Sequence, residues 1–302
     1  MNLHYVLWFL VSLMISLGLF AFMNRREKKV WSQCLLIGVL GTILGVVFAK
    51  LVYYLAMIDF MVMNGWLKSL VDINMGTFSY YGGVAGFCLG IVLSARLTRR
   101  KPTDLLNAYA PAGLLLAALA RFGEVVLDGV GIRDMLYWEH PEHCFFPLAV
   151  SNEWGEWLYA VFMLEGFLTL GVLLLCVTLL KKERFLRSLF YLCLIQILCE
   201  SLRSDSFTWL FVKVEQLLCM LVLAGVLFVY CLRTRGVRHR WLPFLICFPI
   251  AGVFVLLEFA LNGKIPFHHG LCYAIMVAGL FVLGLTEFWA FRRMEANSSS
   301  SL

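Results

Sequence analysis

The sequence predicts an all-α polytopic membrane protein with about nine transmembrane helices. Hydrophobic residues make up 62% of its 302 residues and charged residues only 15%, whereas soluble domains usually carry about 25% charged residues. The mean hydropathy is +0.85. Apolar runs recur along the chain, and Lys and Arg gather in alternate loops between them. These observations exclude a soluble enzyme, a disulfide scaffold and a disordered chain.

Each predicted span is an apolar run of roughly 20 residues, the length of helix that crosses a hydrocarbon core about 30 Å thick. Together the runs account for roughly 180 residues, which agrees with the hydrophobic fraction. They lie at residues 5–23, 30–58, 80–96, 104–123, 157–180, 185–203, 214–232, 241–261 and 270–291. We expect residues 127–156 to form the longest segment outside the membrane and residues 296–302 to be a disordered tail.

Charge in the loops predicts the orientation of the chain, because short cytoplasmic loops are enriched in Lys and Arg. The loops after the first, third, fifth and seventh spans are basic, and Arg292 and Arg293 follow the ninth. The alternate loops, notably residues 139–156, are neutral or acidic. With nine spans, every basic segment falls on one side. We therefore expect the N-terminus outside and the C-terminus in the cytoplasm.

The cysteines and histidines indicate neither a metal site nor a cofactor. Of the ten cysteines, only Cys144 lies outside an apolar run, and no CxxC pair occurs. His268 and His269 have no cysteine or carboxylate at ligand spacing. The net charge of +6 does not indicate nucleic acid, because so apolar a chain has no room for a large solvated basic face. We expect no metal, no cofactor and no nucleic-acid partner.

Polar side chains within the spans concentrate near the outer ends of the helices. Two helices each carry three of them on one face: Arg121, Glu124 and Asp128 at the fourth span, and Gln196, Glu200 and Arg203 at the sixth. Tyr80 and Tyr81 open the third span from the same side, and Lys50, Glu165 and Glu215 lie in the outer halves of their spans. Charged groups in a membrane usually face a cavity or a partner, so this ring predicts a polar cavity open to the outer surface or to lipid headgroups.

Structural explanations compete with this interpretation. The pairs Arg121–Glu124 and Glu200–Arg203 can equally be ion pairs that hold two helix ends at the membrane surface, and Lys50 is better explained by snorkelling or pairing. Their shared depth favours a functional cavity, since independent structural pairs would not need it.

Small residues and two further acids have structural interpretations as well. Gly82, Gly86 and Gly90 have the small-xxx-small spacing of closely packed membrane helices. Glu258 and Glu287 lie in the last two spans, away from the polar ring, and we interpret both as structural.

Four segments carry a resemblance to a known family. They are residues 41–54 (GTILGVVFAKLVYY), residues 78–83 (FSYYGG) followed by Gly86, Ala110-Pro111 leading to Arg121-Phe122-Gly123, and residues 200–205 (ESLRSD) followed by Glu215-Gln216. These stretches resemble the phosphatidylglycerol–prolipoprotein diacylglyceryl transferases of bacterial membranes. The resemblance implies a transferase-like transmembrane body over residues 1–235 and two additional transmembrane helices over residues 236–295.

Several positions depart from the family pattern. Arg121, Glu200 and Arg203 match it as they stand. Lys50 replaces Arg, Tyr81 replaces His, Glu124 replaces Asn and Gln196 replaces Arg, and a one-residue deletion would bring Asp128 onto a family Glu. The resemblance therefore implies a retained scaffold with altered chemistry.

The activity that the resemblance implies is transfer of a diacylglyceryl group from phosphatidylglycerol to the lipobox cysteine in the signal peptide of a prolipoprotein. The implied place is the outer leaflet of the bacterial plasma (inner) membrane, with membrane lipids as further partners and no cofactor. Glycerol phosphate leaves, and the planar fork of Arg grips phosphate oxygens in pairs, so Arg121 and Arg203 are assigned to the phosphate.

The remaining candidates are divided between proton transfer and headgroup binding. Glu124 or Glu200 is expected to accept the thiol proton. Tyr81, a neutral phenol, can donate a hydrogen bond but is a poor proton acceptor. The further headgroup candidates are Gly82, Gly83, Asp128, Gln196 and Lys50.

Two alternatives to the transferase stay open. The first is a non-catalytic phospholipid- or lipoprotein-binding homologue that uses the same cavity, and Tyr81 and Gln196 motivate it. The second is a small-solute transporter, which is disfavoured because the polar ring is one-sided and no internal repeat or mid-span pair of broken helices is evident.

Overall fold

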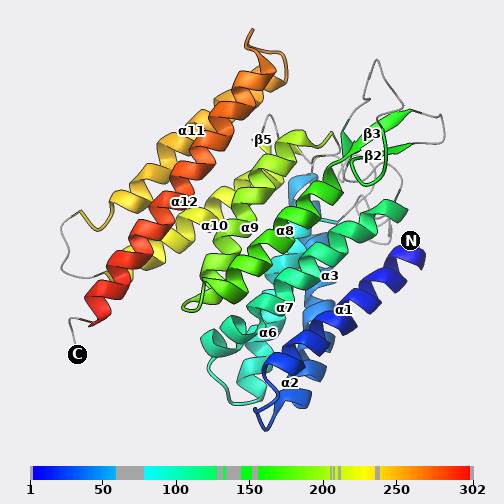
Figure 1. Cartoon of the computed structure of the whole chain (residues 1–302), viewed down its shortest axis with the longest axis vertical. Coiled ribbons are helices and arrows are strands. Elements are labelled where there is room, and N and C mark those ends of the chain that lie inside the picture. Colours follow the sequence, from blue (N-terminus) through cyan, green and yellow to red (C-terminus); the bar gives the residue numbers. More distant parts are fainter. Residues whose placement is uncertain are drawn as a thin grey trace. The chain divides into compact units, whose positions relative to one another are not determined.

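The computed structural model describes residues 3–58, 78–127, 132–133, 144–151, 156–204, 206, 208–209, 212–234 and 239–299. Within these residues, nine helical segments are long and apolar enough to cross a membrane. The predicted fold class is confirmed: the chain is an all-α, multi-pass membrane protein (Figure 1).

The spans follow one another with short connections. They are α1 (Leu3–Met23); α2 (Val30–Leu36), the π-helix η1 (Ile37–Gly41) and α3 (Thr42–Ala56) as one continuous span; α6 (Tyr80–Leu97); α7 (Pro102–Phe122), extended by the 3-10 helix η3 (Gly123–Val126); α8 (Val161–Thr178); α9 (Arg184–Leu202); α10 (Val214–Arg233); α11 (Leu242–Leu261); and α12 (His269–Ser299).

Two small sheets accompany the helices. The first has the antiparallel order β1 (Ile132–Arg133), β3 (Trp157–Ala160), β2 (Ala149–Ser151), and the second pairs β4 (Thr208–Trp209) with β5 (Val212–Lys213). The predicted fifth span therefore begins too early, because residues 157–160 form β3 and the helix starts at Val161. The tail differs too: residues 296–299 continue α12 rather than being disordered, and residues 300–302 lie outside the described residues.

Packing divides the chain into two compact units. The first comprises Met1–Ser188 and Leu202–Trp209, and the second comprises Leu189–Ser201 and Leu210–Leu302. Most of α9 and all of α10 thus pack in one unit with α11 and α12. The division by packing differs from the boundary near residue 235, which the family resemblance implied for the length of the transferase-like body.

Glycines set the contact between α6 and the second span. A Cβ on Gly82 would lie 2.7 Å from the Phe48 carbonyl oxygen, and a Cβ on Gly90 would lie 2.5 Å from Gly41 Cα. Gly86 lies equally close to the backbone of Leu44. The small-xxx-small interpretation is therefore confirmed: only hydrogen at these positions lets the two backbones come this close.

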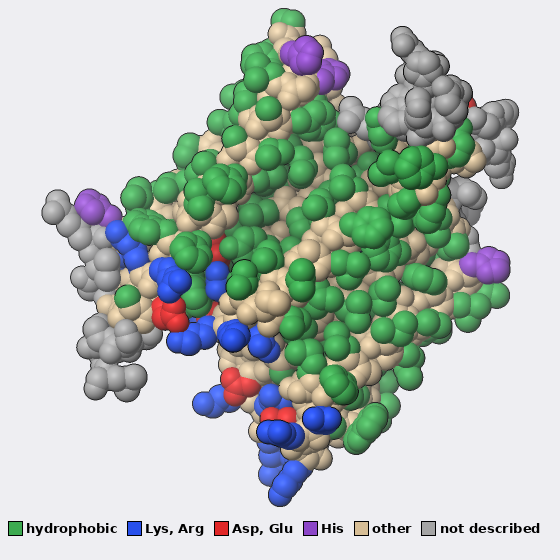
Figure 2. Space-filling view, in the orientation of Figure 1, with side chains coloured by type: hydrophobic (Ala, Val, Ile, Leu, Met, Phe, Trp, Pro, Cys, Tyr) green, Lys and Arg blue, Asp and Glu red, His purple; other side chains and the backbone are tan. Residues whose placement is uncertain are grey.

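Basic loops of the first unit meet at one end of it. Arg100 Nη2 lies 3.7 Å from Glu27 Oε1, and Lys29 Nζ donates a hydrogen bond to the Thr98 carbonyl at 3.3 Å. The α1–α2 and α6–α7 connections therefore lie side by side. In Figure 2, Lys and Arg side chains gather at this end, whereas hydrophobic side chains cover the flanks of the helices. This is the arrangement that the predicted topology requires of these two loops.

A Gly90→Ala substitution is expected to lower the melting temperature of the detergent-solubilised protein, because the added methyl group has no room beside Gly41. Overpacking of this kind costs about 1–3 kcal/mol. Gly171→Ala in α8 is the matched control, since a Cβ there meets nothing within 4 Å and Ala favours a helix by about 0.5–1 kcal/mol over Gly. Equal melting temperatures for the two variants would contradict the close contact between α6 and η1.

Candidate functional site

Two arginines and two glutamates form a closed ion cluster in the first unit. Arg121 Nε lies 2.5 Å from Glu165 Oε1, and Arg121 Nη1 lies 2.5 Å from Glu124 Oε1. Arg203 contacts the second oxygen of each carboxylate, with Nη2 at 3.7 Å from Glu124 Oε2 and Nη1 at 3.6 Å from Glu165 Oε2. Both guanidinium groups therefore share the same two carboxylates. These four residues are called the ion cluster below.

The end of α7 is shaped so that Arg121 and Glu124 point to the same place. Helix α7 changes to a 3-10 helix at Gly123, where a Cβ would collide with the indole ring of Trp8 from α1. The Trp8 Nε1–H also donates a hydrogen bond of 2.6 Å to the Leu119 carbonyl. Glycine is needed at this position because the α1 side chain lies directly on the backbone.

Close packing of α7 on α8 brings Glu165 to Arg121. A Cβ on Gly166 would lie 2.3 Å from the Phe122 ring, so only glycine leaves space for that side chain. Phe122 also packs against Phe167, with ring centroids 5.1 Å apart. The Arg121-Phe122 and Glu165-Gly166 dipeptides thus work as a pair: the ring fills the gap left by the glycine, and the two charged neighbours meet.

The first sheet ties Arg203 to the same end of the unit. Ser204 follows Arg203 and donates two hydrogen bonds to the Ile132 carbonyl in β1, from its backbone N–H at 3.1 Å and from its hydroxyl at 3.0 Å. Strand β1 pairs with β3, which leads directly into α8 and Glu165. Figure 1 shows β2 and β3 beside the end of α8.

Tyr80 forms one wall of the ion cluster. The Ser79 hydroxyl caps α6 by accepting a hydrogen bond of 3.0 Å from the Gly82 N–H, which fixes Tyr80 as the first residue of the helix. The Arg121 guanidinium lies 3.7 Å from the centroid of the Tyr80 ring. Within the part of the chain that the structure describes, the buried Tyr80 hydroxyl has no hydrogen-bond partner.

A second tyrosine comes from α1. The Tyr5 phenol interacts electrostatically with Glu124, Arg121 and Arg203, and it lies close enough to Tyr80 to influence it. The ion cluster is thus flanked by two phenols that can donate hydrogen bonds to an incoming anion.

Burial makes the pairing of these charges obligatory. The exposed fractions of the four side chains are 3% for Arg121, 6% for Glu124, 1% for Glu165 and 9% for Arg203. A buried charge without a partner costs several kcal/mol, whereas a balanced group of charges holds its members in fixed positions. The ion cluster therefore presents two preorganised guanidinium groups to any anion that can compete with the carboxylates.

Other predicted site residues of the first unit have different surroundings. The Lys50 ammonium lies over the rings of Phe78, Tyr54 and Tyr53, at 4.8, 5.3 and 5.7 Å from their centroids. Tyr81 is buried and packs edge-on against Tyr80.

Gly82 and Gly83 lie on the packed face of α6, where a Cβ on Gly83 would make only an ordinary contact of 3.7 Å with Ala49. Asp128 lies outside the described residues, as does most of the 127–156 segment.

Glu200 and Gln196 belong to the second unit. Both are buried on α9, and the Gln196 amide donates a hydrogen bond of 3.1 Å to Glu200 Oε2, as expected for residues four apart on one helical face. Lys213 donates to the backbone carbonyl of Glu200 at 2.6 Å.

Sequence reasoning missed three members of this site. Glu165 was placed in the outer half of its span without a role, Tyr80 was named only as a helix start, and Tyr5 was not singled out. A signal existed for Glu165, because an acid one residue before a glycine in an apolar span is unusual. Nothing in the sequence distinguishes Tyr5 from an interfacial tyrosine.

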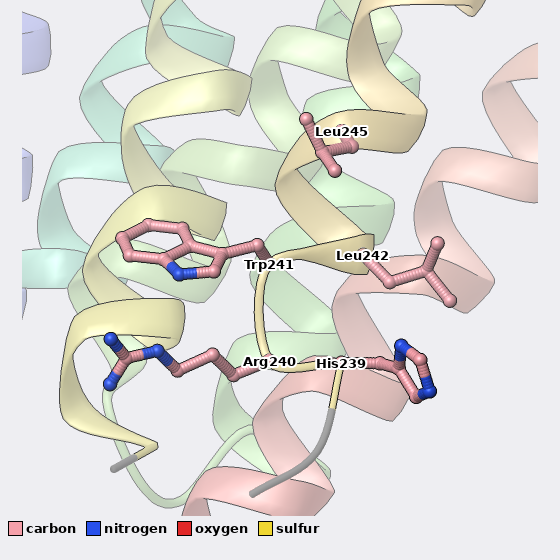
Figure 3. A pocket seen from close by; sticks show the side chains of 5 residues that line it. All are labelled: His239, Arg240, Trp241, Leu242 and Leu245. Atoms are coloured by element: carbon pink, nitrogen blue, oxygen red, sulfur yellow. The ribbon is translucent and has the colours of Figure 1, made fainter. Parts of the chain in front are cut away.

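Other surfaces of the chain offer less chemistry. The pocket in Figure 3 lies where α11 begins, has a volume of about 390 Å³ and is lined by His239, Arg240, Trp241, Leu242 and Leu245. Among the described residues, no group of three or more His, Cys, Asp or Glu side chains is placed to hold a metal ion.

Comparison with known proteins gives a family match. The sequence model of the family described as prolipoprotein diacylglyceryl transferase matches residues 3–231, well over half of the chain, and ends within α10. A protein of Clostridium novyi (strain NT), named phosphatidylglycerol–prolipoprotein diacylglyceryl transferase, is 24% identical over 169 residues. That alignment covers 53% of this chain and 65% of the relative, just under two thirds of its length.

A Glu165→Gln substitution is expected to destabilise the protein by about 3–5 kcal/mol, because it leaves the buried charge of Arg121 without one of its partners. Glu27→Gln is the matched control: it removes a carboxylate from the half-exposed pair with Arg100, which contributes about 0–1 kcal/mol. Thermal unfolding in detergent measures both. A Glu165→Gln variant as stable as Glu27→Gln would mean that the ion cluster is not closed as described.

Proposed function

Because this chain belongs to the prolipoprotein diacylglyceryl transferase family, we propose that it transfers a diacylglyceryl group from phosphatidylglycerol to a prolipoprotein. The acceptor is the thiol of the lipobox cysteine in the signal peptide, and glycerol phosphate is released. The reaction takes place at the outer leaflet of the bacterial plasma membrane. The ion cluster fits that side, since Tyr80 begins α6 and Arg121 ends α7, opposite the basic connection of these two helices.

The ion cluster is the observation that carries the proposal. A phosphodiester needs cationic donors, and guanidinium groups from two separate segments meet within reach of each other through Glu124 and Glu165. The contacts of Arg121 are short and those of Arg203 are long. Arg203 is therefore the donor that turns toward an entering phosphate, while Arg121 stays anchored and completes the grip.

Glu124 is the best placed proton acceptor. Among the described residues, its Oε2 atom is buried without a hydrogen-bond partner and lies 3.7 Å from Arg203 Nη2. When Arg203 turns to the phosphate, this oxygen becomes available to a thiol. The other acid of the ion cluster, Glu165, holds Arg121 from α8.

Charge balance favours this sequence of events. Two guanidinium groups and two carboxylates are formally neutral, so binding a lipid phosphate leaves one excess negative charge. Transfer of the thiol proton to Glu124 cancels one carboxylate charge and produces the thiolate that attacks. The sulfur forms a bond to the terminal glyceryl carbon of the diacylglyceryl group, and the bond from that carbon to the phosphate oxygen breaks. The proton then leaves Glu124 with the glycerol phosphate or to water.

Other predicted residues keep the roles that the family resemblance gives them. Glu200 remains a catalytic candidate, and Tyr81 remains a hydrogen-bond donor. Gly82, Gly83, Asp128, Gln196 and Lys50 remain headgroup candidates.

A non-catalytic lipid-binding protein is the second candidate. The observation that favours it is the carboxylate at position 124, which neutralises Arg121 at 2.5 Å where the family resemblance implies a neutral amide. Such a protein would bind phosphatidylglycerol through the same two arginines without turnover.

Purified protein mixed with phosphatidylglycerol and a lipobox peptide is expected to yield a thioether-linked diacylglyceryl peptide, detected by mass spectrometry. Arg203→Ala should lower the rate by about a hundredfold or more, as expected when a cation that stabilises the departing phosphate is lost. Arg100→Ala, at the opposite end of the first unit, should behave as wild type. Lipid binding that depends on Arg203 but gives no product would identify the second candidate, and no dependence on Arg203 would contradict both.

Glu124→Gln is expected to separate binding from transfer. The amide cannot take the thiol proton, so the rate should fall by about 10²–10⁴-fold. Removing one negative charge should at the same time strengthen binding of phosphatidylglycerol in nanodiscs, while binding of zwitterionic phosphatidylcholine should not change. A variant that transfers the group at the wild-type rate would show that Glu124 is not the proton acceptor.

A further inference from the structure

A second buried polar cluster surrounds the last turn of α9, entirely within the second unit. Glu258 of α11 is 5% exposed and accepts hydrogen bonds from the Ser201 hydroxyl and from Gln216 Nε2, the latter at 2.8 Å. Gln216 also donates to Ser201 Oγ at 2.7 Å. Three helices, α9, α10 and α11, are joined at this point.

Helix α12 reaches the same turn. The Tyr273 hydroxyl donates a hydrogen bond of 3.4 Å to the Ser201 backbone carbonyl, and Met276 Sδ lies 3.3 Å from Ser201 Oγ. Gln216 further donates to the Ile197 carbonyl at 3.1 Å. Carbonyls in the last turn of a helix lack partners within the helix, so side chains from three neighbours satisfy what α9 itself cannot.

Apolar packing alone does not require this arrangement. A carboxylate in a membrane interior is expensive, and a leucine at position 258 would join the helices at lower cost. The partners of Glu258 are a hydroxyl and an amide rather than a cation. These directed bonds fix the rotation and position of the α9 end, which apolar contacts leave looser.

We propose that α11 and α12 act as a brace on the last turn of α9, with Glu258 and Tyr273 as positioning residues for Glu200 and Arg203. The braced turn carries Glu200, and Arg203 follows Ser201 by two residues, within about 7 Å along the chain. The two helices beyond the family match thereby set where the phosphate-binding arginine starts. The role for Arg203 rests on the proposed function, whereas the brace itself does not.

Glu287 provides a matched control on the same pair of helices. It is a fully buried carboxylate of α12 that accepts hydrogen bonds from Tyr191 of α9 at 3.0 Å and Tyr230 of α10 at 3.5 Å. It therefore joins the same helices, but Tyr191 lies ten residues before Ser201 in α9. Loss of either carboxylate should affect stability, and only the loss of Glu258 should affect the braced turn.

Hydrogen exchange tests the brace without any assay of activity. In the full-length protein in nanodiscs, Glu258→Leu should speed exchange of the amides of residues 198–204 by about tenfold relative to wild type. Tyr273→Phe removes one hydroxyl without disturbing the fold and should speed it by a smaller factor. Glu258→Gln retains an oxygen acceptor and should restore slow exchange, and Glu287→Leu should leave this segment unchanged. Slow exchange in both Glu258→Leu and Tyr273→Phe, or equal effects of Glu258→Leu and Glu287→Leu, would overturn the brace.

Kinetics tests the positioning role separately. Glu258→Leu should raise the KM for phosphatidylglycerol by about tenfold, because Arg203 is no longer held ready. Glu258→Gln should restore the wild-type KM, and Glu287→Leu should keep it. An unchanged KM in Glu258→Leu with fast exchange would overturn the positioning of Arg203. If the wild-type protein transfers no diacylglyceryl group, the proposed function fails, and the exchange measurements still decide the brace.

Discussion

Mutual neutralisation of two guanidinium groups by two carboxylates is the constraint on which the first unit depends. Arg121 and Arg203 each contact Glu124 and Glu165, and none of these charges is tolerable alone at this depth of burial. The requirement dictates where α7 must end, how closely α8 must approach it and where the chain after α9 must lie. Gly123, Gly166 and the first sheet are the means by which the sequence satisfies it.

The same constraint explains how a lipid-modifying site can form without a metal ligand among the described residues. The carboxylates keep the arginines in place when no substrate is present, and the unequal contact distances make one arginine an anchor and the other a movable donor. Charge is rearranged rather than created when an anion enters, which suits a site close to apolar lipid. The phenols of Tyr80 and Tyr5 add neutral donors at its edge.

Much of this could be predicted from the sequence, and the rest depends on packing that sequence patterns do not encode. Apolar length located the spans, and the polar positions Arg121 and Arg203 were recognisable because charge inside a span is rare. The pairing of Arg121 with Glu165 was not predictable, since it needs Phe122 to fill the space beside Gly166. The choice between Tyr80 and Tyr81 also depends on the Ser79 cap, which fixes the rotation of α6. The strand at Trp157–Ala160 is as apolar as the helix that follows, so hydropathy could not separate them.

The central claim is that Arg121 and Arg203 together hold a lipid phosphate, and a structure determined in nanodiscs with bound phosphatidylglycerol tests it most directly. The account predicts the phosphorus between the two guanidinium groups, within hydrogen-bonding distance of both, with Arg203 turned away from Glu124 and Arg121 still bound to Glu165. A lipid phosphate bound elsewhere, with all four contacts of the ion cluster intact, would contradict it.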